Sequence, residues 1–143
     1  MDIVTDRLEL KKVCEKVKIF EVSRVVALFP HITKIMTIND GVGIAANQVG
    51  INKTFFLAEI GSRVKLFINP KITYFSEETE IDKEGCLSYP GIFKSIARSK
   101  DITIQYFDYK TKKMVKENYS GFTARVIQHE YDHLIGKCKV GEN

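Results

Sequence analysis

Apolar residues recur at helical spacing near both ends of the chain. Between residues 21 and 38 they return every three or four positions, which predicts an amphipathic helix. Pro30 lies inside this pattern and predicts a kink or a split, because its ring and missing N–H disrupt a helix interior. A second, partly apolar pattern over residues 122–136 predicts a C-terminal helix that ends at Gly136.

The middle of the chain has the pattern of short strands. Residues 54–60 and 63–70 flank Gly61-Ser62, a dipeptide typical of a two-residue hairpin turn. Short antiparallel strands between two helices predict an α+β fold, with the strands packed around the C-terminal helix. No repeat or linker interrupts the pattern, so we expect residues 1–143 to form one domain. Further strands are predicted at residues 71–76, 91–99, 101–109 and 113–120.

Composition narrows the classes of protein without naming one. The 143 residues are 44% apolar and 28% charged, which is ordinary for a globular domain. The net charge of +4 comes from scattered basic residues, so we expect no specific nucleic-acid partner. No apolar run approaches the roughly 20 residues of a membrane span, and the N-terminus lacks a signal-peptide core. Three cysteines without a C-x-x-C pair favour a reducing cytoplasm over a disulfide scaffold.

The segment GVGIAANQVG, residues 41–50, resembles a nucleotide-binding loop because it begins G-x-G-x-x-A. A dinucleotide fingerprint needs a strand before the glycines and a helix directly after them. Here the preceding segment is predicted to be helical, and residues 48–52 would break a helix. The dinucleotide interpretation is therefore disfavoured, and a turn of small residues packed in the core remains as the simpler alternative.

The second helix carries the sequence QHEYDH, which contains an H-E-x-x-H motif. His129 and His133 are four residues apart, so their imidazoles project from one helix face and can reach one metal ion. Glu130 stands beside them. Two of the three histidines of the chain lie in this motif, which favours a metal site over a helix with incidental histidines.

A catalytic ion needs a third protein ligand. After His133 the tail offers only Cys138 and Glu142, so the third ligand is expected upstream. Cys86, in KEGCLSYPG, could be presented by a turn; alone it would more often be a buried apolar cysteine, but beside the other segments it is the favoured ligand. Cys14 and Cys138 lack partners at ligand spacing, and we interpret both as bystanders.

Three blocks together resemble the peptide deformylases, which remove the formyl group from nascent chains. They are G-x-G-x-A-A-x-Q, E-G-C-L-S and Q-H-E-x-D-H, and they span residues 41–133 in the family's order. The resemblance implies roles for six residues. The metal ligands would be Cys86, His129 and His133, with Glu130 as the general acid/base and with Gln48 and the Leu87 backbone N–H stabilising the oxyanion.

The resemblance also implies a substrate, a cofactor and a reaction. Formyl-methionyl peptides would lie along backbone at Val42, Gly43, Ile44 and Gly85, with Val126 and Ile127 either walling a methionine pocket or belonging to the core. The expected ion is Fe(2+), for which Zn(2+), Ni(2+) or Co(2+) can substitute. A metal-activated water would attack the formyl carbon.

Two acidic residues near the motifs are expected to be structural. They are Glu84 and Asp132. Asp132 could pair with Arg98 or Arg125, orient a metal ligand, or remain solvated on the helix.

Two other functions stay open at this point. A zinc peptidase could use the same H-E-x-x-H helix, and a non-catalytic binder could keep a structural metal.

The match to the family weakens at both ends of the chain. The opening MDIVTDRLELKKV lacks the family's YPDPVLR-like start, and ten residues follow His133. We therefore expect a compact, monomeric form without the C-terminal helix of many bacterial members, which puts ribosome docking in doubt. The expected location is the cytoplasm, or the host cytoplasm if the protein is phage-encoded.

Overall fold

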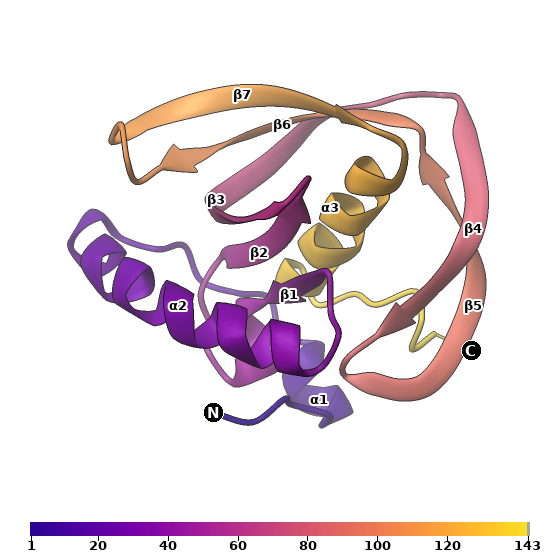
Figure 1. Cartoon of the computed structure of the whole chain (residues 1–143), viewed down its shortest axis with the longest axis horizontal. Coiled ribbons are helices and arrows are strands. Elements are labelled where there is room, and N and C mark those ends of the chain that lie inside the picture. The colour runs from indigo at the N-terminus through magenta and orange to yellow at the C-terminus, as the bar shows by residue number, and fades with distance from the viewer. Residues whose placement is uncertain (143) are drawn as a thin grey trace.

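The computed structural model describes residues 1–142 and opens with helical elements (Figure 1). A short helix α1 (Arg7–Leu10) and a 3₁₀ turn precede the long helix α2 (Val22–Ile38). The predicted split at Pro30 is wrong, because α2 continues through this residue. Its buried positions Val25, Ile32 and Met36 lie on both sides of the proline, so packing of one continuous face holds the helix together.

A five-stranded antiparallel sheet, with strand order β1-β2-β3-β6-β7, forms the centre of the molecule. The predicted hairpin at Gly61-Ser62 is confirmed, since Ile60 pairs with Arg63 across the turn. The two strands predicted at residues 63–70 and 71–76 form one strand. Its register is irregular around Asn69, whose backbone is left-handed. The strands are β1 (Gly43–Ala45), β2 (Phe55–Ile60), β3 (Arg63–Phe75), β6 (Asp101–Asp108) and β7 (Lys113–Ser120).

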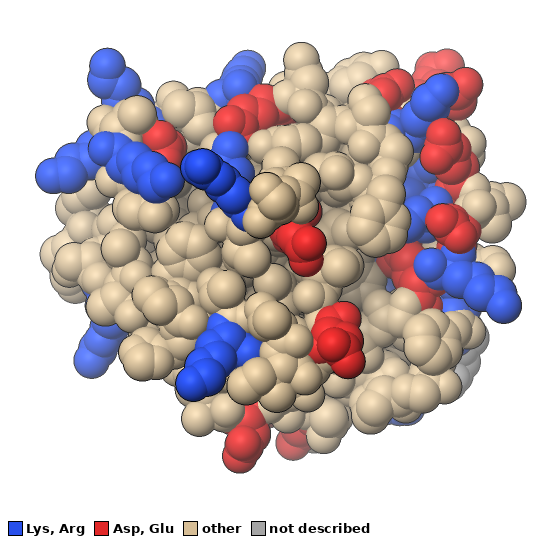
Figure 2. All heavy atoms as spheres, in the orientation of Figure 1, with Lys and Arg blue, Asp and Glu red and all other residues tan. Residues whose placement is uncertain are grey.

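A second sheet of two strands stands beside the first. It contains β4 (Thr79–Cys86) and β5 (Tyr89–Ser99), with Cys86 as the last residue of β4. Strand β4 was not predicted from the sequence, because most of its residues are exposed and charged residues interrupt the apolar alternation of a strand. In Figure 2, acidic and basic side chains mix along the right-hand edge, where Figure 1 places β4 and β5.

The last helix, α3 (Gly121–Leu134), packs on the larger sheet and confirms the α+β class. Alternate residues of β2 face opposite layers: Phe56 packs in the cluster that contains α3 residues, and Phe55 and Leu57 pack in the cluster that contains α2 residues. The sheet is therefore covered by α3 on one face and by α2 on the other (Figure 1). Across residues 1–142, every helix is too short or too polar to cross a bilayer.

Candidate active site

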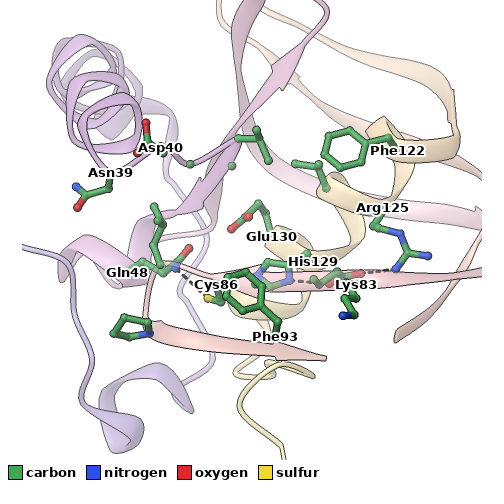
Figure 3. Close-up of a pocket in the computed structure, with 18 of the residues that line it drawn as sticks. Asn39, Asp40, Gln48, Lys83, Cys86, Phe93, Phe122, Arg125, His129 and Glu130 are labelled. Carbon is green, nitrogen blue, oxygen red and sulfur yellow. Dashed lines mark hydrogen bonds and ion pairs between the residues drawn. The ribbon is translucent and has the colours of Figure 1, made fainter. Parts of the chain in front are cut away.

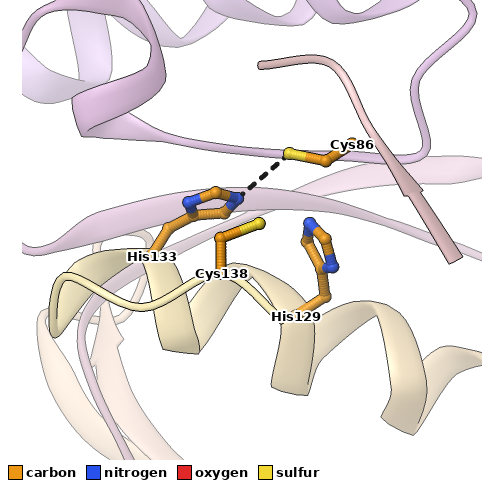
Figure 4. Close-up of side chains that lie close together, drawn as sticks. All are labelled: Cys86, His129, His133 and Cys138. Atoms are coloured by element: carbon orange, nitrogen blue, oxygen red, sulfur yellow. Dashed lines mark hydrogen bonds between the residues drawn. The ribbon is translucent and has the colours of Figure 1, made fainter. Parts of the chain in front are cut away.

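Helix α3 presents both histidines of the motif to one point. The rings of His129 and His133 lie 5.0 Å apart between centroids, as residues one turn apart on a helix should. The end of β4 brings Cys86 to the same point, where its Sγ lies 3.3 Å from His133 Nε2 (Figure 4). The structure thus brings together the three residues that the sequence analysis selected as metal ligands.

Cys138 also belongs to this cluster, so its interpretation as a bystander is wrong. Its Sγ and the nearest donor atoms of Cys86, His129 and His133 all lie within 4.8 Å of one another (Figure 4). Interaction between the two neighbouring thiol groups lowers the pKa of Cys138 and, together with burial, raises the pKa of Cys86. The other free cysteine, Cys14, lies in the core between α3 and the sheet, as a bystander should.

Glu84 orients one of the two imidazoles. Its Oε1 accepts a hydrogen bond of 2.9 Å from His129 Nδ1, which leaves Nε2 as the ring nitrogen available to a metal. This role was missed by the sequence analysis, which gave Glu84 only a structural part. A signal was present: Glu84 and Cys86 are two residues apart on a strand, and such residues project from the same face.

Two arginines hold Glu84 in place. Arg98 donates to both carboxylate oxygens at 2.9 Å, and Arg125 Nη1 donates to Oε2 at 2.6 Å. Burial alone would raise the pKa of Glu84, but the hydrogen bonds from His129 and Arg98 lower it to about 2. Asp132 pairs with Arg98 at 2.6 Å, one of the two partners expected for it. The network joins β4, β5 and α3 behind the histidines.

Glu130 lies directly against the backbone of strand β1. A Cβ atom built on Gly43 would lie 2.6 Å from Glu130 Oε2 and 2.9 Å from its Cγ, so only glycine leaves room for this carboxyl group. Burial raises the pKa of Glu130 against the opposing effect of the two histidines. Its Oε1 is buried and has no hydrogen-bond partner among the described residues, although Glu130 lines the cavity.

The amide of Gln48 is held in one orientation. Its Oε1 accepts a 2.8 Å hydrogen bond from the Ala45 backbone N–H. Its Nε2 donates to Ser88 Oγ at 3.1 Å and contacts Cys86 Sγ at 3.5 Å. The NH₂ end of this buried side chain therefore points toward the cysteine and histidine cluster (Figure 3).

A cavity of about 540 Å³ opens onto these groups (Figure 3). Three of the expected substrate-contacting residues, Val42, Gly43 and Gly85, line it, and so does Leu87, the expected oxyanion donor. Ile44 is not among its lining residues: its side chain is fully buried in the core beside α2, which leaves only its backbone for the expected contact with substrate. The cavity is also lined by Gln48, Cys86, Val126, His129 and Glu130.

Val126 and Ile127 both belong to the core cluster between α3 and the sheet, and of the two Val126 also lines the cavity. Adjacent helix residues point about 100° apart, so one of them can also reach the cavity while its neighbour packs only in the core.

Comparison with known proteins identifies the family of this chain. Residues 2–141 match the sequence profile of the polypeptide deformylases. The chain belongs to this family. A peptide deformylase of Pseudothermotoga lettingae is 42% identical over 111 residues, which cover 78% of this chain and 64% of that protein. The aligned part of the chain therefore spans somewhat less than two thirds of that relative.

Solved deformylase structures share the whole architecture. The crystal structure of peptide deformylase from Thermotoga maritima has a TM-score of 0.88 and 38% identity, covering 96% of this chain and 92% of that one. A structure of the class I type b enzyme from Acinetobacter baumannii with Met-Ala-Ser bound has a TM-score of 0.90 and 29% identity. The match covers 98% of this chain and 96% of that one.

The residues present fit a deformylase-type divalent ion. Thiolates and imidazoles are donors for Fe(II), Co(II), Ni(II) and Zn(II), and four such donors converge here. The carboxylate of Glu84 fixes one imidazole in the orientation that ligand histidines adopt in metal sites. The donor set does not select one of these metals.

Proposed function

We propose that this protein hydrolyses the N-formyl group of formyl-methionyl peptides, releasing formate. The observation that carries the proposal is the convergence of Cys86, His129 and His133 beside a buried carboxyl group and an oriented amide. We assign the metal to Cys86, His129 and His133, with Fe(2+) as the expected physiological ion. When bound, a divalent ion would lower the pKa of a coordinated water and polarise the formyl oxygen.

Glu130 moves the proton in this reaction. Glu130 lines the cavity and its buried Oε1 has no hydrogen-bond partner among the described residues, so the carboxyl group can accept a proton from the attacking water. The same carboxyl group can then deliver the proton to the departing amine. Contact with Gly43 holds the carboxyl group close to the strand along which the peptide would lie. Positioned proton transfer of this kind contributes about 10²–10⁴-fold to a rate.

Gln48 stabilises the negative charge that develops on the formyl oxygen. Because Ala45 holds its carbonyl end, its NH₂ group is directed at the reacting centre before the substrate arrives. The Leu87 backbone N–H is the second donor in this assignment. A donor of this kind is worth about 10²–10³ in rate when it is placed in advance.

The peptide is expected to extend between two short backbone segments. Residues 42–43 and 85–87 line the cavity and can offer main-chain groups to an extended chain. The first side chain, methionine, would occupy the apolar part of the cavity beside Val126. Such peptides are the N-termini of newly synthesised chains, so we expect the protein to act in the cytoplasm of its cell.

Formate release from formyl-Met-Ala-Ser by anaerobically purified protein of known metal content tests the proposal. Release of formate without cleavage of internal peptide bonds supports it; cleavage of unformylated Met-Ala-Ser would instead indicate a peptidase. Glu130→Gln should lower the rate by about 10²–10⁴-fold with the metal retained. Glu117→Gln, the same chemical change on β7 and outside the cavity lining, is the matched control.

A further inference from the structure

The tail that follows α3 places a second sulfur at the candidate metal site. Cys138 is five residues beyond His133, outside the helix. The chain reverses at Gly136, whose φ of 78° is left-handed, and the backbone N–H of Lys137 bonds back to the Asp132 carbonyl. This reversal returns Cys138 to the side of α3 that carries the two histidines (Figure 4).

The position of Cys138 is fixed at both ends of the reversed segment. A side chain on Gly136 would collide with the Lys11 backbone carbonyl, and one on Gly141 would collide with the Tyr89 ring. Between them, Val140 is fully buried in a small core cluster with Leu10 and Tyr89. The sulfur is therefore held at the site by close packing on α1 and β5 and does not depend on a flexible tail.

The distances suit coordination of one ion by all four residues. Metal–sulfur bonds of about 2.3 Å and metal–nitrogen bonds of about 2.0–2.1 Å place tetrahedral donors about 3.3–3.8 Å apart. Cys86 Sγ and His133 Nε2 already have this separation, at 3.3 Å. The four nearest donor atoms span at most 4.8 Å, so small rotamer adjustments bring the remaining pairs into range.

We propose that Cys138 is a fourth protein ligand, which tightens metal binding and restrains the reactivity of the ion. Each thiol that binds the metal loses its proton to solvent and contributes one negative charge as a thiolate. One thiolate leaves a divalent site with a net charge of about +1, whereas two thiolates neutralise it. Four protein donors would also fill the coordination sphere of a tetrahedral ion, so a water would bind only as a fifth ligand or in place of Cys138. The effect on turnover rests on the proposed deformylase function; the coordination itself does not.

Cobalt substitution tests the coordination directly. The apoprotein of Cys138→Ala is loaded anaerobically with one equivalent of Co(II), after thiol titration of the unfolded protein has shown that no cysteine is oxidised. Thiolate ligands give charge-transfer absorption in the near ultraviolet, and we expect the band of Cys138→Ala to be about half that of the wild type. Cys14→Ala, which removes a core thiol, should keep the full band. An unchanged band in Cys138→Ala would overturn the proposal.

Metal competition and turnover complete the test. Against a chelator, Cys138→Ala should bind Zn(II) at least about tenfold more weakly than the wild type. Formate release per bound ion should rise several-fold in the same variant, and an equal or lower rate would refute the restraint on reactivity. If the band halves while neither protein releases formate from formyl-Met-Ala-Ser, the fourth ligand stands and the proposed deformylase function fails.

Discussion

Two carboxylates in this molecule receive several hydrogen bonds each, in very different surroundings. Glu84 accepts from Arg98, Arg125 and His129, and the side chains of this cluster are at most 8% exposed. Glu117 on β7 accepts from Lys65, Tyr106 and Tyr119, and the carboxylate and its lysine are both about one third exposed, at 32%.

The difference lies in what each cluster holds in place. Glu117 joins neighbouring strands of the larger sheet, where partial exposure to solvent screens each charge and lowers its desolvation cost. Glu84 joins the small sheet to α3 and at the same time orients a candidate metal ligand. A buried charge whose partner is removed is far more costly than an exposed one. The two clusters therefore have similar chemistry but different roles. The Glu117 cluster contributes to stability alone, whereas the Glu84 cluster contributes to stability and also orients the candidate metal ligand.

Removal of the Glu84 charge should have the largest effect. Glu84→Gln leaves the buried guanidinium of Arg125 without a counter-charge and leaves Arg98 with Asp132 alone, so we expect unfolding to require about 3–5 kcal/mol less than in the wild type. Without its carboxylate partner, His129 should hold metal about 10–100-fold more weakly. Urea unfolding and chelator competition measure the two effects. Glu84→Asp, which keeps the charge, should lose less stability; equal losses would refute the charge argument.

Asp132→Asn separates the charge network from the metal ligand. Asp132 contacts Arg98 but not His129, and its side chain is 18% exposed. We therefore expect a loss of about 1–2 kcal/mol in unfolding free energy, because one charged hydrogen bond is weakened. Metal affinity should remain that of the wild type. A fall in metal affinity as large as that of Glu84→Gln would show that the whole network, and not Glu84 alone, orients the histidine.

Glu117→Gln should have a smaller effect on stability. The pair with Lys65 is partly solvated, and exposed ion pairs contribute at most about 1 kcal/mol. Metal binding and formate release should be unchanged, because Glu117 lies outside the cavity lining. A loss of stability comparable to that of Glu84→Gln would contradict the distinction between the two clusters.

The smallest expected effect is the pH dependence of the stability lost in Glu117→Gln. Burial alone would raise the pKa of Glu117, but hydrogen bonds from Lys65, Tyr119 and Tyr106 lower it below its usual value. The stability it provides is therefore present above the unfolded-state pKa of about 4.3, and it is lost as pH falls through the lower folded-state pKa. The difference in unfolding free energy between wild type and Glu117→Gln should shrink on acidification below about pH 4. A constant difference would show that the ionised carboxylate is not its source.

The sequence predicted the elements whose patterns are local. The H-E-x-x-H spacing places two imidazoles on one helix face, and the hairpin at Gly61-Ser62 follows from its turn residues. Strand β4 was not predicted, because charged residues on both its faces hide the alternation of a strand. Cys138 was misread for a geometric reason: spacing in the sequence does not show that the chain, after the predicted helix end at Gly136, reverses there. Only tertiary packing brings this residue back to the histidines.

The bare backbone of Gly43 has a mechanical consequence. Strand β1 is the edge of the larger sheet, and its Cα at Gly43 touches the carboxyl group of Glu130 with no side chain between them. A peptide that pairs along this edge would be separated from its proton carrier by the thickness of one strand. Any sideways displacement of that strand would therefore shift the reacting bond and the carboxyl group together and preserve their alignment.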